Sequence, residues 1–286
     1  MNNKFLNSFK ILRPYQWHKN FIIFAPIFFS AQIDLSNIKL IILGLISFCI
    51  LSSSVYIFND LFDIEKDRQH HKKKLRPIAS GKISRIYAFI ICAILVTVLF
   101  STYFYFNLNT SSYYCLLIYL ILNILYTLGL KNIPVLELFL VSSGFVIRLI
   151  YGALIINVSL SNWIIVSIGL LSMLLVIGKR RSDIVTTENQ KQNYSIYYLD
   201  LLSCCISAVV MTSYLLFCLS DYAKLQFGNY TIISSVFVIY AILHYLRVVI
   251  IKNSADDPSE LVLKDPNIYL SVILWISFFI VSIYFY

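Results

Sequence analysis

Three oxygen-bearing side chains follow a long apolar run at intervals of four residues: Asn59, Asp63 and Asp67. On an α-helix each residue turns about 100°, so a step of four residues turns only about 40° and the three side chains line one face. Asp60 lies about 20° from Asp67 on the same helix. Carboxylates clustered in this way repel one another unless something positive lies between them.

Oxygen ligands of this kind suit Mg²⁺, which usually keeps several waters and bridges one or two carboxylates to substrate phosphates. We therefore predict that Asn59, Asp63 and Asp67 hold Mg²⁺, with Mn²⁺ as a substitute, against a diphosphate. Asp63 and Asp67 are the predicted catalytic residues. The alternative is a solvated acidic helix end that neighbouring Lys and Arg side chains balance.

A basic stretch follows the acids directly and ends in the loop signal "RPIASG". Pro77 and Gly81 punctuate a loop that can fold back and present Arg76 to a phosphate. A solvated loop whose charge only fixes membrane topology would look similar. We give that interpretation to the run Lys72–Lys74.

The composition indicates a membrane protein. Of 286 residues, 59% are hydrophobic and only 13% are charged, and the mean hydropathy is +0.79. A soluble domain has about a quarter of its residues charged, and one soluble core could not bury so much apolar surface. The six cysteines all lie in apolar runs without CxxC spacing, which favours buried hydrophobic residues over disulfides or metal ligands.

Nine apolar segments recur at roughly membrane length, so we expect an all-α, polytopic bundle of nine transmembrane helices that forms a single domain over residues 1–286. The first is too short alone and is expected to extend back toward Lys10. The segments are Asn20–Gln32, Leu40–Phe58, Ile86–Phe106, Ser112–Leu130, Val135–Ile156, Trp163–Ile177, Leu201–Leu219, Tyr230–Ile251 and Ile268–Tyr286.

Lys and Arg are distributed unevenly between the connections. The N-terminal stretch and the connections after the second, fourth, sixth and eighth segments hold most of them, whereas the opposite connections hold only Lys39 and Lys224. The positive-inside rule then places the N-terminus and the acidic motif in the cytoplasm and the C-terminus outside, in a multi-pass protein of the cytoplasmic membrane. The net charge of +9 is thus mainly a topology signal with some affinity for anionic membrane lipids, not a nucleic-acid surface.

The acidic motif resembles a known family. "NDLFDIEKDR" followed by "RPIASG" is similar to the first aspartate motif, NDxxDxxxD, of the UbiA superfamily of membrane prenyltransferases. The resemblance implies a nine-helix bundle that binds Mg²⁺-diphosphate at its cytoplasmic end.

Other stretches resemble one branch of that superfamily, the decaprenyl-phosphate phosphoribosyltransferases, in the same order along nearly the whole chain. They are "LRPYQWHKNFIIFAPIFFS" (Leu12–Ser30), "LYTLGLKNIPVLE" (Leu125–Glu137), "GFVIRLIYG" (Gly144–Gly152), "VIGKRR" (Val176–Arg181) and "DPSELVLKD" (Asp257–Asp265).

Two positions depart from the expected patterns. Prenyl-transferring members carry a second aspartate-rich motif after the sixth helix, where this chain reads "GKRRSDIV", with Asp183 as the one acid among three bases. That departure fits the phosphoribosyltransferase branch. In the eighth segment the branch has an arginine before the tyrosine, whereas His244 precedes Tyr245 here, so a phosphate role at that position stays open.

The resemblance also implies the residues that bind substrate. Arg148 lies well inside the fifth segment, where a charge usually faces a cavity or a partner, although a long side chain can also snorkel to the membrane interface. Lys179 and Arg180 could serve topology alone, and Tyr126 is a candidate ribose contact. The full implied set is Lys19, Arg76, Tyr126, Lys131, Arg148, Lys179, Arg180 and Asp183.

The reaction implied by the branch moves a 5-phosphoribosyl group from phosphoribosyl diphosphate to a lipid-linked polyprenyl phosphate of the decaprenyl type. One alternative is a UbiA-type prenyltransferase that attaches an isoprenoid from an allylic diphosphate to an aromatic or other acceptor. A second is a lipid carrier or membrane scaffold without catalysis. The oligomeric state stays open, with a homo-oligomer among the choices.

Overall fold

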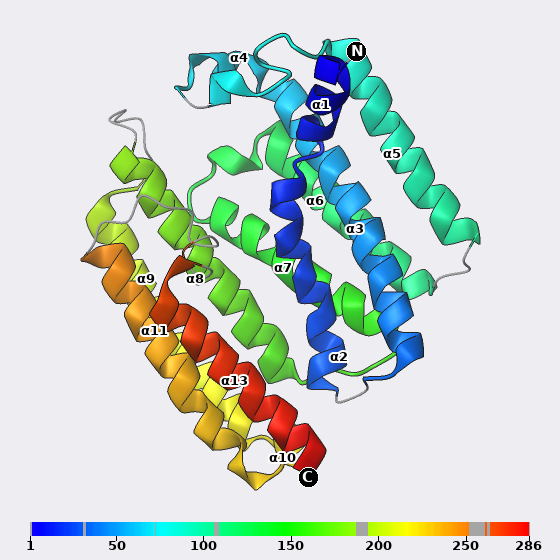
Figure 1. The fold of residues 1–286 in the computed structure, drawn as a ribbon. Coiled ribbons are helices and arrows are strands. Elements are labelled where there is room, and N and C mark those ends of the chain that lie inside the picture. The colour runs from blue at the N-terminus through cyan, green and yellow to red at the C-terminus, as the bar shows by residue number, and fades with distance from the viewer. Residues whose placement is uncertain are drawn as a thin grey trace. The chain divides into compact units, whose positions relative to one another are not determined.

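The computed structural model describes residues 2–30, 33–71, 73–105, 109–186, 194–251, 261 and 264–285, and these ranges contain helices and no strand (Figure 1). The expected all-α class is confirmed. The elements are α1 (Asn2–Ile11), η1 (Pro14–Phe24), α2 (Ala25–Phe29), α3 (Leu35–Phe62), α4 (Ile64–Gln69), η2 (Lys73–Leu75), α5 (Arg85–Tyr105), α6 (Thr110–Leu128), η3 (Leu130–Asn132), α7 (Leu136–Ile155), α8 (Asn162–Thr186), α9 (Ile196–Leu219), α10 (Asp221–Phe227), η4 (Asn229–Ser234), α11 (Ser235–Ile250) and α13 (Pro266–Phe285).

Eight stretches within the described residues are helical, long and apolar enough to cross a membrane. They coincide with the second to ninth expected segments, and the chain is a multi-pass integral membrane protein. The count of nine spanning helices is therefore not reached in the described part of the chain.

The first expected segment accounts for the difference. Instead of one helix reaching back toward Lys10, the chain forms α1, the 3₁₀ helix η1 and the five-residue helix α2. Proline lacks the backbone N–H and disfavours the right-handed helical region for the residue before it. Arg13, which precedes Pro14, accordingly lies in the left-handed region with φ 53° and ψ 55°. The end of the expected segment, residues 31 and 32, lies outside the described residues.

The chain divides into two compact units, which are described separately. The first comprises Met1–Phe28, Gln32–Asn132 and Ile147–Val158, and the second comprises Phe29–Ala31, Ile133–Val146 and Ser159–Tyr286. The single transferase domain expected over residues 1–286 stays a prediction.

The first unit is built around α3, which lies beside α5 and also packs against η1 and α6 (Figure 1). Its core includes Phe48, whose ring lies 4.8 Å from that of Tyr119 and 5.3 Å from that of Tyr151. Gly152 lets α7 approach η1 closely, because a Cβ atom there would collide with the backbone carbonyl of Ile23. Dense packing of this kind resists deformation, so it fixes the end of α3 that carries the acidic motif.

The second unit packs α8 against α9, and α11 against α9 and α13. Its larger apolar cluster includes Leu174, Val210, Ile242 and Tyr245. A second cluster contains Leu138 of α7 and Ile177 of α8, so the beginning of α7 and the final turns of α8 are held by the same core.

Candidate active site

The acidic motif lies across a break between two helices. α3 ends at Phe62 and α4 begins at Ile64, with Asp63 between them at φ −94° and ψ 12°. The helical hydrogen bonds nevertheless continue, since Asp63 N donates to Asn59 O at 2.9 Å and Asp67 N donates to Asp63 O at 2.8 Å. Buried Ile64 anchors α4 in an apolar cluster with Ile57. The expected uninterrupted helix is thus bent at Asp63, while the four-residue spacing is retained.

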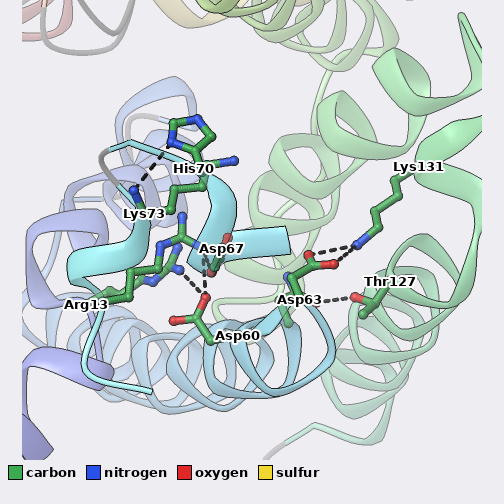
Figure 2. A network of polar contacts seen from close by, with 10 residues as sticks. Arg13, Asp60, Asp63, Asp67, His70, Lys73, Thr127 and Lys131 are labelled. Atoms are coloured by element: carbon green, nitrogen blue, oxygen red, sulfur yellow. Dashed lines mark hydrogen bonds and ion pairs between the residues drawn. The ribbon is translucent and has the colours of Figure 1, made fainter. Parts of the chain in front are cut away.

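The first pair of oxygen side chains faces α6 and η3. Lys131 Nζ donates to both carboxylate oxygens of Asp63, at 2.6 and 2.7 Å (Figure 2). Thr127 Oγ1 donates to the amide oxygen of Asn59. Both partners come from 68 positions further along the chain.

The second pair faces two arginines. Arg76 donates to Asp67 Oδ2 at 2.6 Å and to Asp60 Oδ1 at 3.1 Å, and Arg13 donates to the same oxygen of Asp60 (Figure 2). The carboxylates are well shielded from solvent, since the side chains of Asp60 and Asp67 are 4% and 5% exposed. Charge-assisted hydrogen bonds of this type are about twice as strong as neutral ones.

The loop that carries Arg76 folds back as the sequence predicted. Ser80 N donates to Arg76 O at 2.9 Å, and Gly81 supplies the positive φ of 75° that ends the turn. Ile78 and Ala79 are buried against the unit, and Arg68 Nε donates to Ala79 O at 3.2 Å. Packing of the loop therefore sets the direction from which Arg76 reaches the carboxylates.

The oxygen atoms of the acidic motif are suitable ligands for a divalent metal, but they do not form a preformed metal site. Three carboxylates and one amide oxygen within about three helical turns are the hard ligands that Mg²⁺ prefers. Within the described residues, however, no group of three or more His, Cys, Asp and Glu side chains converges on one point. Each carboxylate is instead paired with Arg13, Arg76 or Lys131. A metal bound with a diphosphate fits if these cations exchange carboxylate oxygens for phosphate oxygens.

A second polar group lies deep in the first unit, around Arg148. Its guanidinium donates to Asn20 Oδ1 at 2.7 Å and to Tyr119 Oη at 2.9 Å, and it lies 4.8 Å from the ring centres of Phe48 and Tyr119. The residue is only 4% exposed. Snorkelling requires a head group in water, so the structure favours the alternative in which Arg148 faces a partner. Whether it contacts phosphate stays a prediction.

In the second unit the basic run at the end of α8 is divided among three environments. Lys179 is exposed. Arg180 grips the carboxylate of Glu137 with two nitrogens, one at 2.8 Å, and lies 3.4 Å from Asp183. Arg181 is buried and donates to Asp200 at 2.6 Å. Three consecutive residues on a helix point about 100° apart, which explains the division.

Glu137 is held where α7 begins. Val135, directly before this helix, has φ 65°, which is unfavourable for a β-branched residue, and its N–H donates to Tyr194 Oη at 2.6 Å. Burial raises the pKa of the Tyr194 hydroxyl above its ordinary value. These contacts fix the turn from which Glu137 reaches Arg180.

The structure thus brings together five of the predicted site residues in the first unit: Asn59, Asp63, Asp67, Arg76 and Lys131. In the second unit it pairs Arg180 with Asp183. Lys19 on η1 and Tyr126 on α6 are half-buried. The functional roles of all these residues stay predictions.

Four polar partners at the acidic motif and at Arg180 were not among the predicted site residues: Arg13, Asp60, Thr127 and Glu137. Asp60 belongs to the acidic motif itself. Arg13 and Glu137 lie inside stretches that carry the family resemblance, so a signal for them was present. Thr127 lies in the same stretch as Glu137, directly after Tyr126, so the same signal covered it.

His244, whose role the sequence left open, pairs with Asp265, with Nε2 and Oδ1 3.2 Å apart. Burial raises the pKa of the Asp265 carboxyl, but hydrogen bonds from the backbone of Ile268 and Asn267 and from His244 outweigh it and hold the pKa below its ordinary value. Asp265 is therefore an ionised partner for His244 at neutral pH.

Comparisons with known proteins agree with this architecture. The model of the UbiA prenyltransferase family matches residues 20–283. The decaprenyl-phosphate phosphoribosyltransferase of Corynebacterium glutamicum is 28% identical over 96% of this chain and 86% of its own length, and that of Mycolicibacterium smegmatis is 27% identical over 96% and 92%. A UbiA homolog from Archaeoglobus fulgidus, solved with DMAPP and Mg²⁺, has a TM-score of 0.71 at 18% identity, over 96% of this chain and 98% of its own. At that identity the likeness shows the fold.

The Glu137–Arg180 pair gives a stability prediction. Glu137→Gln removes the carboxylate to which two nitrogens of Arg180 donate. Loss of a charged partner in a shielded site lowers the free energy of unfolding by roughly 1–3 kcal/mol. The midpoint of thermal unfolding of the purified chain in detergent should fall accordingly. The control is Glu65→Gln, because the Glu65 side chain is 72% exposed and pairs with the exposed Arg68 and Arg85. Equal midpoints for Glu137→Gln and the control would contradict the structural role of the pair.

Proposed function

The chain belongs to the UbiA prenyltransferase family, and from this membership we propose that it moves a 5-phosphoribosyl group from phosphoribosyl diphosphate to a polyprenyl phosphate of the decaprenyl type. The predicted family is confirmed, and the protein is a UbiA-family membrane transferase. The observation that carries the proposal is the charge-matched acidic helix end, where the carboxylates of Asp60, Asp63 and Asp67 are paired with Arg13, Arg76 and Lys131.

Two findings support the phosphoribosyl donor over an allylic one. The relatives that align along nearly the whole chain bear the name of that activity. In addition, where prenyl-transferring members carry a second aspartate-rich motif, the end of α8 carries the exposed base Lys179, beside Arg180 and Arg181, which pair with Glu137 and Asp200. An allylic diphosphate has all its charge in one diphosphate, whereas phosphoribosyl diphosphate adds a separate 5-phosphate that requires cations.

In the proposed mechanism, Mg²⁺ held by Asn59, Asp63 and Asp67 would neutralise charge on the diphosphate. Arg76 and Lys131, already at the carboxylates, bind diphosphate oxygens and stabilise the charge that grows there as the anomeric C–O bond breaks. A phosphate oxygen of the acceptor forms the new bond to the anomeric carbon, and diphosphate leaves. The acceptor oxygen is already anionic, so the reaction needs no strong general base.

The alternative enzyme is a prenyltransferase that uses an allylic diphosphate. The Archaeoglobus fulgidus homolog was solved with DMAPP and Mg²⁺, but the likeness to this chain covers the fold alone and does not choose between the donors. A carrier or scaffold without catalysis would have no use for the paired acidic motif.

The orientation is part of the proposal. The Lys and Arg excess places the N-terminus and the loop that carries Arg76 in the cytoplasm, and the C-terminus outside. The water-soluble donor would then reach the acidic motif from the cytoplasm, while the lipid acceptor arrives through the membrane.

A labelling experiment tests the orientation. In a variant without its six native cysteines, a cysteine at exposed Ser80 should be protected from a membrane-impermeant thiol reagent in intact cells, and a cysteine at exposed Asn162 should react. Permeabilised cells provide the control, since both positions should then react. Labelling at residue 80 and protection at residue 162 in intact cells would reverse the proposed topology.

The metal role predicts that turnover requires Mg²⁺ or Mn²⁺ and is abolished by a chelator. Asp63→Asn and Asp67→Asn should each lower kcat/KM by about 100-fold or more, because losing one ligand removes several kcal/mol of charge stabilisation. Monodisperse elution of both variants from a sizing column is the control for folding. If the double variant turned over at the wild-type rate, Asp63 and Asp67 would not hold the metal.

The donor is tested by offering competing diphosphates to the purified chain with polyprenyl phosphate and Mg²⁺. We expect phosphoribosyl diphosphate to be consumed with release of diphosphate, and geranyl or farnesyl diphosphate to be refused. Lys179→Ala should mainly raise the apparent KM for phosphoribosyl diphosphate, because a 5-phosphate is held equally in the ground and transition states. Transfer from an allylic diphosphate to an aromatic acceptor, with no use of phosphoribosyl diphosphate, would overturn the proposal in favour of the prenyltransferase alternative.

A further inference from the structure

Arg13 occupies a backbone conformation that residues with a Cβ atom rarely adopt, at φ 53° and ψ 55°. The surrounding contacts hold it there. Buried Ser53 on α3 donates to Leu12 O at 2.9 Å and accepts from Trp17 Nε1 at 3.1 Å, so the chain is fastened to α3 on both sides of Arg13. Unfavourable backbone conformations that neighbours enforce are concentrated at functional sites.

The side chain of Arg13 reaches the acidic helix end. Its guanidinium lies 5.2 Å from the centre of the Tyr56 ring and donates to Asp60. The break between α1 and η1 therefore directs the Arg13 guanidinium toward Asp60, a carboxylate that is not among the predicted metal ligands.

Asp60 lies at the centre of a chain of charges. Arg13 binds Asp60, Asp60 binds Arg76, and Arg76 binds Asp67 (Figure 2). Asp67 thus shares Arg76 with Asp60, whereas Asp60 is paired with both Arg76 and Arg13. If a metal took Asp67, Arg76 would lose one carboxylate and keep the other.

We propose that Asp60 is a positioning residue for the diphosphate site: it keeps Arg76 in place when a metal-bound diphosphate takes Asp67. Arg13 supplies the charge that compensates Asp60, so that Arg76 retains its own charge for the diphosphate oxygens. The proposal rests on the diphosphate site described above and does not depend on which group is transferred.

The test separates metal binding from diphosphate binding in the purified full-length chain. Free Mn²⁺ is titrated and followed by electron paramagnetic resonance, and inorganic pyrophosphate is titrated by calorimetry at saturating Mg²⁺. Asp60→Asn should leave Mn²⁺ affinity unchanged and weaken pyrophosphate about tenfold or more, as expected when an oriented, charge-assisted contact is lost. Asp60→Glu should restore part of that affinity. Asp67→Asn should weaken Mn²⁺ itself.

Two further variants guard the interpretation. Glu65→Gln removes an exposed acid of α4 and should leave both affinities unchanged. The double variant Arg13→Gln, Asp60→Asn removes both members of the shielded ion pair. It therefore leaves no unpaired Arg13 charge that could prevent folding, as Asp60→Asn alone could. Its affinity for pyrophosphate should be reduced no further than that of Asp60→Asn.

The outcomes distinguish the two proposals. Equal losses of Mn²⁺ affinity in Asp60→Asn and Asp67→Asn would make Asp60 a metal ligand and overturn the positioning role. Unchanged pyrophosphate affinity in Asp60→Asn and in the double variant would overturn it too. A wild-type chain that binds magnesium pyrophosphate but refuses phosphoribosyl diphosphate would overturn the phosphoribosyl donor alone.

Discussion

Carboxylates at the end of a buried apolar helix carry a desolvation cost that only close cations offset, and the first unit is arranged around that requirement. Three acids of one motif meet three cations from three separate segments: Arg13 before η1, Arg76 in a folded-back loop, and Lys131 in η3. The left-handed turn, the Gly81 loop and the short 3₁₀ helix each deliver one of these cations. These irregular segments therefore place the cations that balance the charge of the carboxylates.

The same requirement explains how a site without a preformed metal cluster can be a metal–diphosphate site. The paired acids and bases stabilise one another without a metal, and two of the pairs, Lys131–Asp63 and Arg76–Asp67, each contain one ligand for a metal and one donor for a phosphate. When a metal and a diphosphate bind together, the metal can bind the carboxylates of these pairs and the diphosphate can bind their cations. The angular order along the helix then matters, because Asn59 and Asp63 face Thr127 and Lys131, whereas Asp67 and Asp60 face the arginines.

Part of the site could be predicted from the sequence, and the contacts that could not be predicted depend on tertiary structure. Spacing predicted that Asn59, Asp63 and Asp67 share one helix face, whereas in the structure Asn59 and Asp63 face Thr127 and Lys131 and Asp67 faces Arg76. Pro77 and Gly81 predicted the fold-back of the loop. Pro14 is a signal for a break in the first segment, and the expectation of one helix that extends back toward Lys10 did not use it. Partners such as Lys131 for Asp63, 68 positions apart, depend on tertiary packing, which periodicity along one helix does not contain. The basic run at the end of α8 was similarly read as a unit, although helix geometry sends Arg180 and Arg181 to different acids.

The exchange of partners at the acidic helix end is the central claim, and a structure of the purified chain with Mg²⁺ and phosphoribosyl diphosphate tests it most directly. The account predicts that Asp67 contacts the metal and that Arg76 has left Asp67, remains hydrogen-bonded to Asp60 and donates to a diphosphate oxygen. Arg76 still bridging Asp60 and Asp67, with the diphosphate bound away from all three carboxylates, would contradict it.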